Sequence, residues 1–254
     1  MITQNQIQYS RSLHLKKFRD KYDEFIVEGP KLVKELLNSD YRVKQVFTLQ
    51  DHLDELGHIS LKGIKPEIVS QKELNRISTL KNPNGMLAIA QTQQLELSDF
   101  KMNNEFVLLL DGISDPGNLG TIIRTADWFG IHTLVCSHDT VDVYNPKVVQ
   151  ATMGSVFRSR IYYCDLVEFI SGLPQEIPVY GTFLNGDNLY RENFGQSGVV
   201  VIGSESHGIR PSTEQMIVRR LNIPSSGSCV DSLNASVASA IICSEISRNQ
   251  LKNI

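Results

Sequence analysis

The chain has 254 residues, of which 41% are apolar, 21% charged and 7% aromatic, and its net charge is −3. This composition is typical of a soluble globular protein, and the slight negative charge argues against a protein that coats nucleic acids through bulk charge. No apolar run approaches the roughly 20 residues of a membrane span, and the first residues lack the apolar stretch of a secretory signal.

Four cysteines lie far apart in the sequence and form no CxxC pair: Cys136, Cys164, Cys229 and Cys243. This spacing favours unpaired thiols over zinc ligands or disulfides. We therefore expect a cytoplasmic protein without a bound metal.

Positive charge is concentrated near the start of the chain. Residues 1–22 contain one acid, Asp20, and five basic side chains: Arg11, Lys16, Lys17, Arg19 and Lys21. Such a cluster can contact phosphates, although a merely solvated basic face would have the same composition.

Residues 1–95 are predicted to form a small αβ domain. A helix or arm covers 1–22, and a turn at 28–30 places Pro30 in the first turn of an amphipathic helix. A further helix is predicted at Gln71–Leu80. The predicted strands are Phe25–Val27, Val43–Leu49, Ile68–Val69 and Met86–Gln91.

A polar stretch at 96–104 is predicted to be a linker, and residues 105–254 are predicted to form a second domain. Unbroken apolar strands alternate there with helices, which indicates an α/β fold with a parallel sheet covered by helices on its faces. The predicted strands are Phe106–Leu110, Ile131–Cys136, Arg160–Cys164, Val179–Phe183, Val199–Ile202 and Leu221–Ile223. One helix is predicted to follow Asn118, and two further helices are predicted at Pro146–Phe157 and Ser232–Asn249.

The first stretch that could carry chemistry is 111–124, where a glycine-rich loop joins a buried strand to a helix. A helix start of this kind suits an anion, but the spacing matches neither GxGxxG nor GxxxxGK[ST]. On these residues alone, Asn118 is interpreted as a helix cap and Arg124 as a surface residue.

Two later loops follow the last two strands, where α/β proteins place their ligands. In the loop at 203–208, Glu205 is either a turn residue or a positioned carboxylate, and His207 has no visible partner that would make it an acid or base. Ser232 and Asn234 are typical N-cap residues before an apolar-periodic helix, and the small side chains around them leave room for a ligand.

Together, the order and spacing of these stretches resemble the three sequence motifs of the SpoU (TrmH-type) RNA ribose methyltransferases of the SPOUT superfamily. The matching segments are Asn118-Leu-Gly120-Thr-Ile-Ile-Arg124, Val201-Ile-Gly203-Ser-Glu205-Ser-His-Gly208, and Asn222-Ile-Pro224 followed by Ser232-Leu-Asn234-Ala-Ser-Val-Ala238. The resemblance covers about 106–250, and residues 10–90 are similar to the RNA-binding substrate domain that precedes this catalytic domain.

The resemblance implies an α/β fold with a deep trefoil knot, an exception to the rule that chains are unknotted. It also implies S-adenosylmethionine as the methyl donor, held by backbone groups of the knot loops. Carried over by position, the cofactor-binding residues are Gly203, Ile223 and Leu233, with Thr182 near the adenosine.

The implied reaction is methyl transfer to a ribose 2′-hydroxyl of RNA. The family's motif arginine corresponds to Arg124, which we expect to orient the hydroxyl and stabilise the developing alkoxide, because a protonated guanidinium has no acceptor and is a poor base. The other catalytic residues implied by the resemblance are Asn118, Glu205, Ser232 and Asn234.

The resemblance further implies a homodimer, in which the motif arginine can reach the partner's cofactor site. Ribosomal RNA is favoured as the substrate, because the matched region includes a separate RNA-binding domain. The alternatives are a tRNA 2′-O-methyltransferase, a non-catalytic RNA-binding or assembly protein on the same scaffold, and an unrelated α/β nucleotide enzyme.

Overall fold

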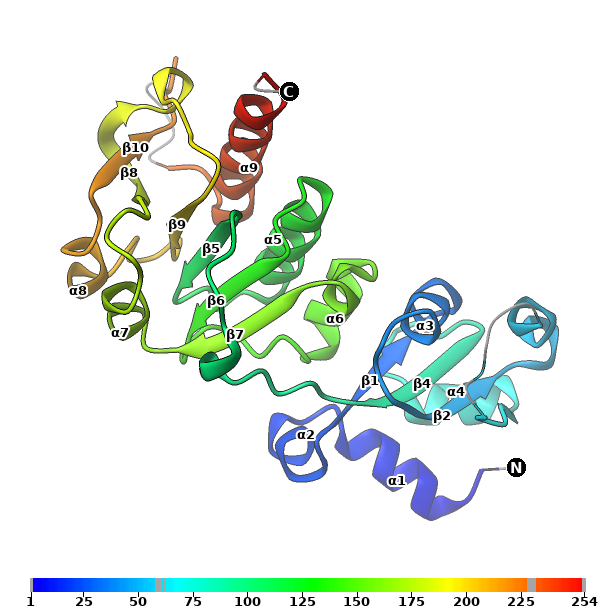
Figure 1. Ribbon diagram of the computed structural model, residues 1–254. Coiled ribbons are helices and arrows are strands. Elements are labelled where there is room, and N and C mark those ends of the chain that lie inside the picture. The colour runs from blue at the N-terminus through cyan, green and yellow to red at the C-terminus, as the bar shows by residue number, and fades with distance from the viewer. Residues whose placement is uncertain (1, 58–60, 62, 228–231, 253–254) are drawn as a thin grey trace. The chain divides into compact units, whose positions relative to one another are not determined.

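The computed structural model describes residues 2–57, 61, 63–227 and 232–252, so Cys229 and the end of the predicted 225–231 loop lie outside the described residues. The chain divides into two compact units. The first contains residues 1–94 and 142–158, and the second contains 95–141 and 159–254. Figure 1 shows the elements of each unit in chain order.

The first unit is built on a four-stranded sheet in the order β1-β4-β2-β3. Its strands are β1 (Glu24–Glu28), β2 (Val43–Thr48), β3 (Glu67–Ile68) and β4 (Met86–Gln91). β4 pairs antiparallel with both β1 and β2, and β3 pairs parallel with β2. The helices of this unit are α1 (Gln4–Ser12), α2 (Lys16–Tyr22), α3 (Pro30–Leu37), α4 (Gln71–Ile77) and α6 (Pro146–Thr152).

A buried ion pair holds α2 in the first unit. Arg19 is only 3% exposed, and its Nε and Nη2 both donate to Asp142 Oδ2, at 3.0 and 2.6 Å. Its Nη1 donates to the backbone oxygens of Leu13 and His14, each at 3.0 Å. Because one guanidinium satisfies a carboxylate and two carbonyls, the turn between α1 and α2 is fixed by a single side chain.

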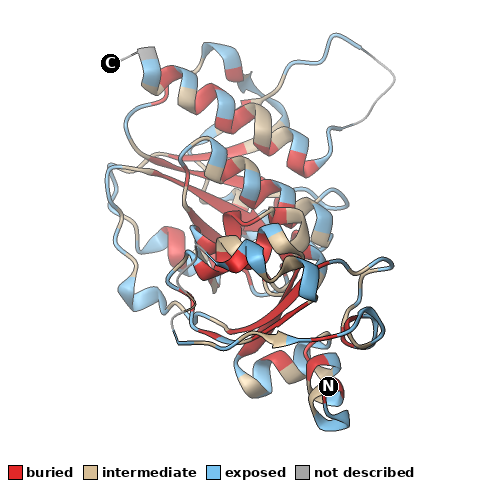
Figure 2. Cartoon of the chain, turned by 90° about the vertical axis from the view of Figure 1, so that its right-hand side faces the viewer, coloured by how far each residue is buried: buried red, intermediate tan, exposed pale blue. Residues whose placement is uncertain are grey.

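The second unit is built on a six-stranded sheet in the order β10-β8-β9-β5-β6-β7, and every neighbouring pair is parallel. The strands are β5 (Phe106–Asp111), β6 (Thr133–Ser137), β7 (Arg160–Cys164), β8 (Val179–Asn188), β9 (Gly198–Gly203) and β10 (Arg219–Asn222). Figure 2 shows the central strands as buried, which is the expected burial for continuous apolar strands between two helical layers.

Helices cover both faces of this sheet, as predicted for a parallel α/β fold. Figure 1 places α5 (Pro116–Trp128) and α9 (Ala235–Lys252) on one face, with α7 (Leu166–Ser171) and α8 (Pro211–Glu214) on the other. On the α7 face, Phe169 and Ile170 pack with Val107, Leu109 and Val201 in one apolar cluster. Among the described residues, no helix is long and apolar enough to cross a membrane.

The predicted helix over 146–157 differs from the structure. Helix α6 ends at Thr152, because Met153 and Gly154 adopt left-handed conformations with φ of 53° and 103°. A side chain at Gly154 would also crowd Glu35, so a glycine is required there. A 3₁₀ turn at 155–157 completes the segment.

The predicted linker at 96–104 also differs from the structure. Leu95, Phe100 and Met102 pack against the core of the second unit, and the Phe100 ring lies 5.0 Å from that of Phe169. Spaced single apolar residues in a polar stretch carry too little periodicity to reveal this packing. In addition, β8 continues to Asn188, five residues beyond the predicted end at Phe183.

Replacing Asp142 with alanine should leave the buried Arg19 charge without a counterion. We expect the free energy of unfolding to fall by about 3 kcal/mol, because the guanidinium keeps its desolvation and loses its counterion. Urea denaturation measures this change. The matched control is Asp20→Ala, which removes the carboxylate of the exposed Lys16–Asp20 pair and should change stability by less than about 1 kcal/mol. Equal losses in the two variants would contradict the assigned role of Arg19.

Candidate functional site

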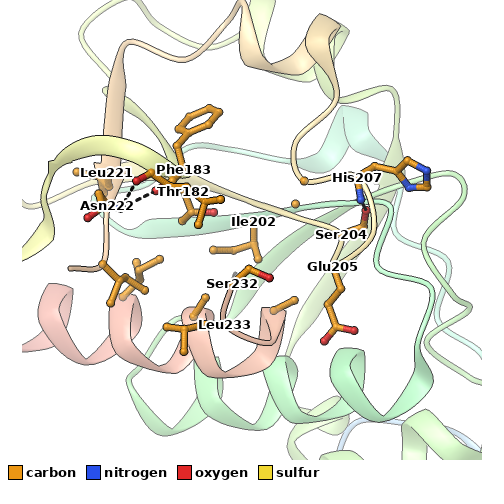
Figure 3. Close-up of a pocket in the computed structure, with 17 residues that line it drawn as sticks. Thr182, Phe183, Ile202, Ser204, Glu205, His207, Leu221, Asn222, Ser232 and Leu233 are labelled. Atoms are coloured by element: carbon orange, nitrogen blue, oxygen red, sulfur yellow. Dashed lines mark hydrogen bonds between the residues drawn. The ribbon is translucent and has the colours of Figure 1, made fainter. Parts of the chain in front are cut away.

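A cavity of about 400 Å³ lies in the second unit, between the middle of β8, the ends of β9 and β10, and the start of α9. The carboxyl ends of parallel strands meet at the same edge of a sheet, so the topology gathers these segments. All four residues predicted to bind a cofactor lie on its wall: Thr182, Gly203, Ile223 and Leu233. Figure 3 shows the lining residues that come from these separate parts of the chain.

A closely packed loop forms one side of the cavity. The Ser204 amide donates to the Gly208 oxygen at 3.1 Å, and the Gly208 amide donates to the Ser204 oxygen at 2.9 Å. Gly208 has a φ of 67°, which favours glycine. A Cβ atom at Gly203 would overlap the backbone of Gly208 and Ile209, so the close approach of the two backbones requires a glycine at 203.

Three of the predicted catalytic residues join in one hydrogen-bond network, although they lie on different elements. Asn118 in α5 donates from Nδ2 to Glu205 Oε1 at 3.0 Å. Asn234, just before α9, donates from Nδ2 to Asn118 Oδ1 at 3.0 Å and also to Glu205 Oε1. The structure therefore brings the three sequence motifs together at one point.

The network is anchored by the starts of two helices. The Asn118 amide donates to the Asp115 N-cap side chain at 2.8 Å. Asn234 Oδ1 accepts from the amide of Ser236 at 2.9 Å and from its hydroxyl at 2.6 Å. Of the two N-cap residues predicted from the sequence, Asn234 caps α9, whereas Ser232 lies two residues before the cap. The Asn234 side chain thus serves the helix and the network at once.

A second, smaller cavity of about 140 Å³ adjoins the large one. Ser204, Glu205 and Ala235 line both cavities, whereas Asp115 and Asn118 line only the smaller one. Glu205 thus stands between a large, mainly apolar cavity and a small polar one. Such a carboxylate can contact molecules bound on both sides.

The remaining predicted catalytic residues have different positions. Ser232 lines the large cavity and makes no hydrogen bond with the network. Arg124 is exposed on α5, lines neither cavity, and has no ion pair or hydrogen bond among the described residues. His207, which was not predicted to be catalytic, lies on the rim of the large cavity, where it is exposed and its Nδ1 lies 2.7 Å from Ser206 Oγ.

An ion pair that sequence reasoning missed holds the loop in place. Asp111, buried at the end of β5, accepts from the Arg210 amide at 2.9 Å and from Arg210 Nε at 2.5 Å. The side-chain bond to the Asp111 carboxylate raises the pKa of Arg210, and Asp139 lies 3.2 Å from the same guanidinium. The sequence contains one signal of this pair: Asp111 directly follows an unbroken apolar strand. An acid buried at that position must be paired with a positive charge.

The walls of the large cavity combine apolar and polar surfaces. Ile202, Leu221 and Ile242 supply apolar side chains. Asn222 Nδ2 donates to the backbone oxygens of Phe183 and Leu184, at 3.2 and 2.6 Å, and ties the end of β10 to β8. Such a site suits a small molecule with a flat apolar part and several polar groups.

Comparison with protein families identifies the part of the chain that contains the site. Residues 105–244 match the model of the SpoU rRNA Methylase family. The chain belongs to this family. Residues 4–88 match the model of the MRM3-like substrate binding domain, so both parts of the resemblance inferred from the motifs are confirmed.

Curated SpoU-family relatives align with nearly the whole chain. The chain is 30% identical to the 23S rRNA (guanosine(2553)-2′-O)-methyltransferase RlmP of Bacillus subtilis, over 91% of this chain and 92% of the relative. It is 28% identical to a 23S rRNA (uridine(2479)-2′-O)-methyltransferase of Streptomyces viridochromogenes, over 92% of this chain and 85% of the relative.

Solved structures show the same SpoU-family architecture. A TrmH-family protein from Porphyromonas gingivalis is 40% identical, with a TM-score of 0.84 and coverage of 98% of this chain and 99% of that chain. An AdoMet-bound rRNA methyltransferase from Sinorhizobium meliloti is 29% identical, with a TM-score of 0.87 and coverage of 98% and 96%. The predicted α/β SPOUT-type fold preceded by a small domain is therefore confirmed. Within the described residues there is no group of three or more histidine, cysteine or acidic side chains that could hold a metal.

Replacing Gly203 with alanine should disrupt the cavity. We expect loss of S-adenosylmethionine binding by at least tenfold, because the added methyl group would push the loop at 204–208 away from β9. Isothermal titration calorimetry with S-adenosylmethionine measures this effect. Gly195→Ala is the control, since a Cβ there meets no atom within 4 Å. If Gly203→Ala bound the ligand as tightly as the control, the close backbone approach would not matter for the site.

Proposed function

We propose that this protein transfers a methyl group from S-adenosylmethionine to a ribose 2′-hydroxyl of ribosomal RNA. Membership of the SpoU family and the relatives that carry this activity in their names support the reaction and its substrate class. The observation that carries the proposal is the meeting of Asn118, Glu205 and Asn234 beside a cavity of about 400 Å³.

The large cavity fits S-adenosylmethionine in size and chemistry. Its volume lies in the range of small-molecule sites, roughly 300–1,000 Å³. The apolar walls suit an adenine ring, and the strand ends offer backbone amides and carbonyls to the polar groups. We expect Thr182, Gly203, Ile223 and Leu233 to hold it. When bound, this cosubstrate supplies a methyl group on a positively charged sulfur.

Glu205 and the two asparagines provide a rigid support for the acceptor ribose. Both amide groups donate to Glu205 Oε1, and Oε2 has no partner among the described residues, so this oxygen is free to accept a bond from the ribose or from an arginine. Ser232, on the cavity wall, can position the donor or the ribose. Holding the two reactants in fixed positions supplies much of the rate enhancement in a transfer of this kind.

Arg124 is proposed to act on the developing negative charge of the 2′-oxygen. A guanidinium is a donor without an acceptor, so it stabilises an alkoxide and binds a neighbouring phosphate rather than removing a proton. Its exposed position outside both cavities supports a role toward the site of a partner subunit. We therefore propose a homodimer that forms through the exposed face of α5.

The first unit is proposed to bind the ribosomal RNA, which agrees with its match to a substrate-binding domain. The runner-up is a non-catalytic RNA-binding protein on the same scaffold, and failure to bind S-adenosylmethionine in calorimetry would favour it. The trefoil knot and the cytoplasmic location stay predictions.

Replacing Arg124 with alanine should lower methylation by at least about a hundredfold, the loss typical of removing one donor to a developing oxyanion. The affinity for S-adenosylmethionine should stay within about twofold. Transfer of labelled methyl groups to unmodified 23S rRNA measures the first quantity, and calorimetry measures the second. Arg219→Ala is the control, because Arg219 is also exposed in this unit and lines neither cavity. Near-full activity of the Arg124 variant would refute its assigned role.

Trp128 reports on the proposed dimer. It is the single tryptophan of the chain, it is 83% exposed, and it lies one helical turn beyond Arg124 on α5. Light scattering should give twice the 28.5 kDa chain mass. Trp128→Glu should give an inactive monomer, whereas Val218→Glu, at a residue that is 76% exposed, should stay dimeric. An active monomer would rule out the dimer proposal.

A further inference from the structure

Helix α2 carries two lysines whose charge the proposed reaction does not use. Lys17 and Lys21 are exposed and have no acidic partner among the described residues. The neighbouring Lys16, in contrast, pairs with Asp20 at 2.9 Å. Lys17 and Lys21 are four residues apart, so they lie on the same side of the helix and repel each other.

The buried ion pair of Arg19 fixes the direction in which these lysines point. Arg19 faces inward to Asp142, Leu13 and His14. At 100° per residue, positions 17 and 21 lie about 160° on either side of position 19. The contact that anchors α2 therefore holds both lysines on the opposite, outward side.

Aromatic rings accompany the two lysines. Lys17 Nζ lies 4.8 Å from the centroid of the Phe18 ring, and Lys21 Nζ lies 5.2 Å from that of Tyr22. The two rings are nearly parallel, with an angle of 11° between their planes and 6.2 Å between their centroids. Both residues are only partly buried. Ammonium groups beside partly exposed aromatic rings are a combination that binds single-stranded nucleic acid, through phosphate contacts and base stacking.

Charge complementarity identifies the occupant. Residues 1–22 contain five basic side chains, of which Arg19 pairs with Asp142 and Lys16 with Asp20, so Arg11, Lys17 and Lys21 have no acidic partner among the described residues. The whole chain, in contrast, has a net charge of −3. Because the protein as a whole is negatively charged, unpaired lysines gathered on one helix face indicate that a polyanion binds at that face. The aromatic rings favour RNA bases over an acidic peptide.

We propose that Lys17, Phe18, Lys21 and Tyr22 form an RNA-contact surface, the α2 strip, which binds an unpaired segment of the substrate. The lysines contact successive phosphates, and the partly exposed Phe18 ring stacks with a base. This proposal rests on the proposed function, because the RNA is the substrate of the same enzyme. It adds the surface of the protein that binds this RNA.

The test measures binding of in vitro-transcribed 23S rRNA at several salt concentrations by filter retention. At about 0.1 M salt, K17E/K21E should bind at least about tenfold more weakly than the original protein. Loss of two phosphate contacts should also reduce the slope of log K against log salt by about 1.5. Phe18→Ala should weaken binding by about tenfold with an unchanged slope, because stacking releases no counterions.

The matched control is K31E/K72E, which makes the same change of charge at two exposed lysines of the same unit. It should bind within about twofold of the original protein. K17Q/K21Q removes the contacts without adding acids and should show the same fall in slope. Thermal unfolding followed by circular dichroism checks that each variant is folded.

The outcomes separate this proposal from the proposed function. If the original protein methylates the RNA but K17E/K21E and K17Q/K21Q bind it equally well, the α2 strip is not the contact surface. An equal loss in K31E/K72E would show a bulk charge effect and would also overturn the proposal. If the original protein neither binds nor methylates ribosomal RNA, both proposals fall together.

Discussion

The site depends on one shared acceptor, the Oε1 atom of Glu205. Two amide groups from residues 116 positions apart in the chain, Asn118 and Asn234, donate to it. This arrangement is possible only because β9 ends beside the starts of α5 and α9. The parallel sheet brings these three chain segments to one edge, and the closely packed loop at 204–208 directs Glu205 toward the helix starts.

Two charge pairs hold elements in place. Asp111 and Arg210 fix the loop that carries Glu205, whereas Arg19 and Asp142 fix the turn before α2. In each pair a mostly buried residue meets a partner about a hundred positions away. Such pairs contribute through the position they impose, since burying two charges is itself costly. The loop with Glu205 and helix α2, which can contact substrate, are thus held by charge pairs that do not contact it.

The sequence was sufficient where the local pattern decides the structure. Unbroken apolar runs such as Phe106–Leu110 and Val199–Ile202 predicted the strands, and Asn234 was recognisable as a helix cap. The motif spacing identified the residues that the structure brings together, including Gly203. The reason why position 203 must be a glycine is visible only in the structure, where its backbone lies against that of Gly208.

What the sequence could not predict depends on partners distant in the chain. The partners of Asp111 and Arg19 could not be predicted, because nothing in the local sequence identifies a counterion about a hundred positions away. The break after Thr152 depends on a left-handed methionine. The packing of Phe100 depends on Phe169, which lies 69 residues later in the chain. The role of Arg124 is the hardest to read from one chain, since no described residue of its own chain pairs with it.

Asn234 carries a chemical constraint that helix capping alone would not impose. Its Oδ1 caps α9 and its Nδ2 donates to Glu205, so the two ends of one amide serve different purposes. An aspartate would cap the helix equally well, but it would place a second carboxylate against Glu205 in place of a donor. Spontaneous deamidation at this position would therefore leave a folded protein with a dismantled site. Ageing of the purified enzyme would then reduce the fraction of active molecules without changing the fraction that is folded.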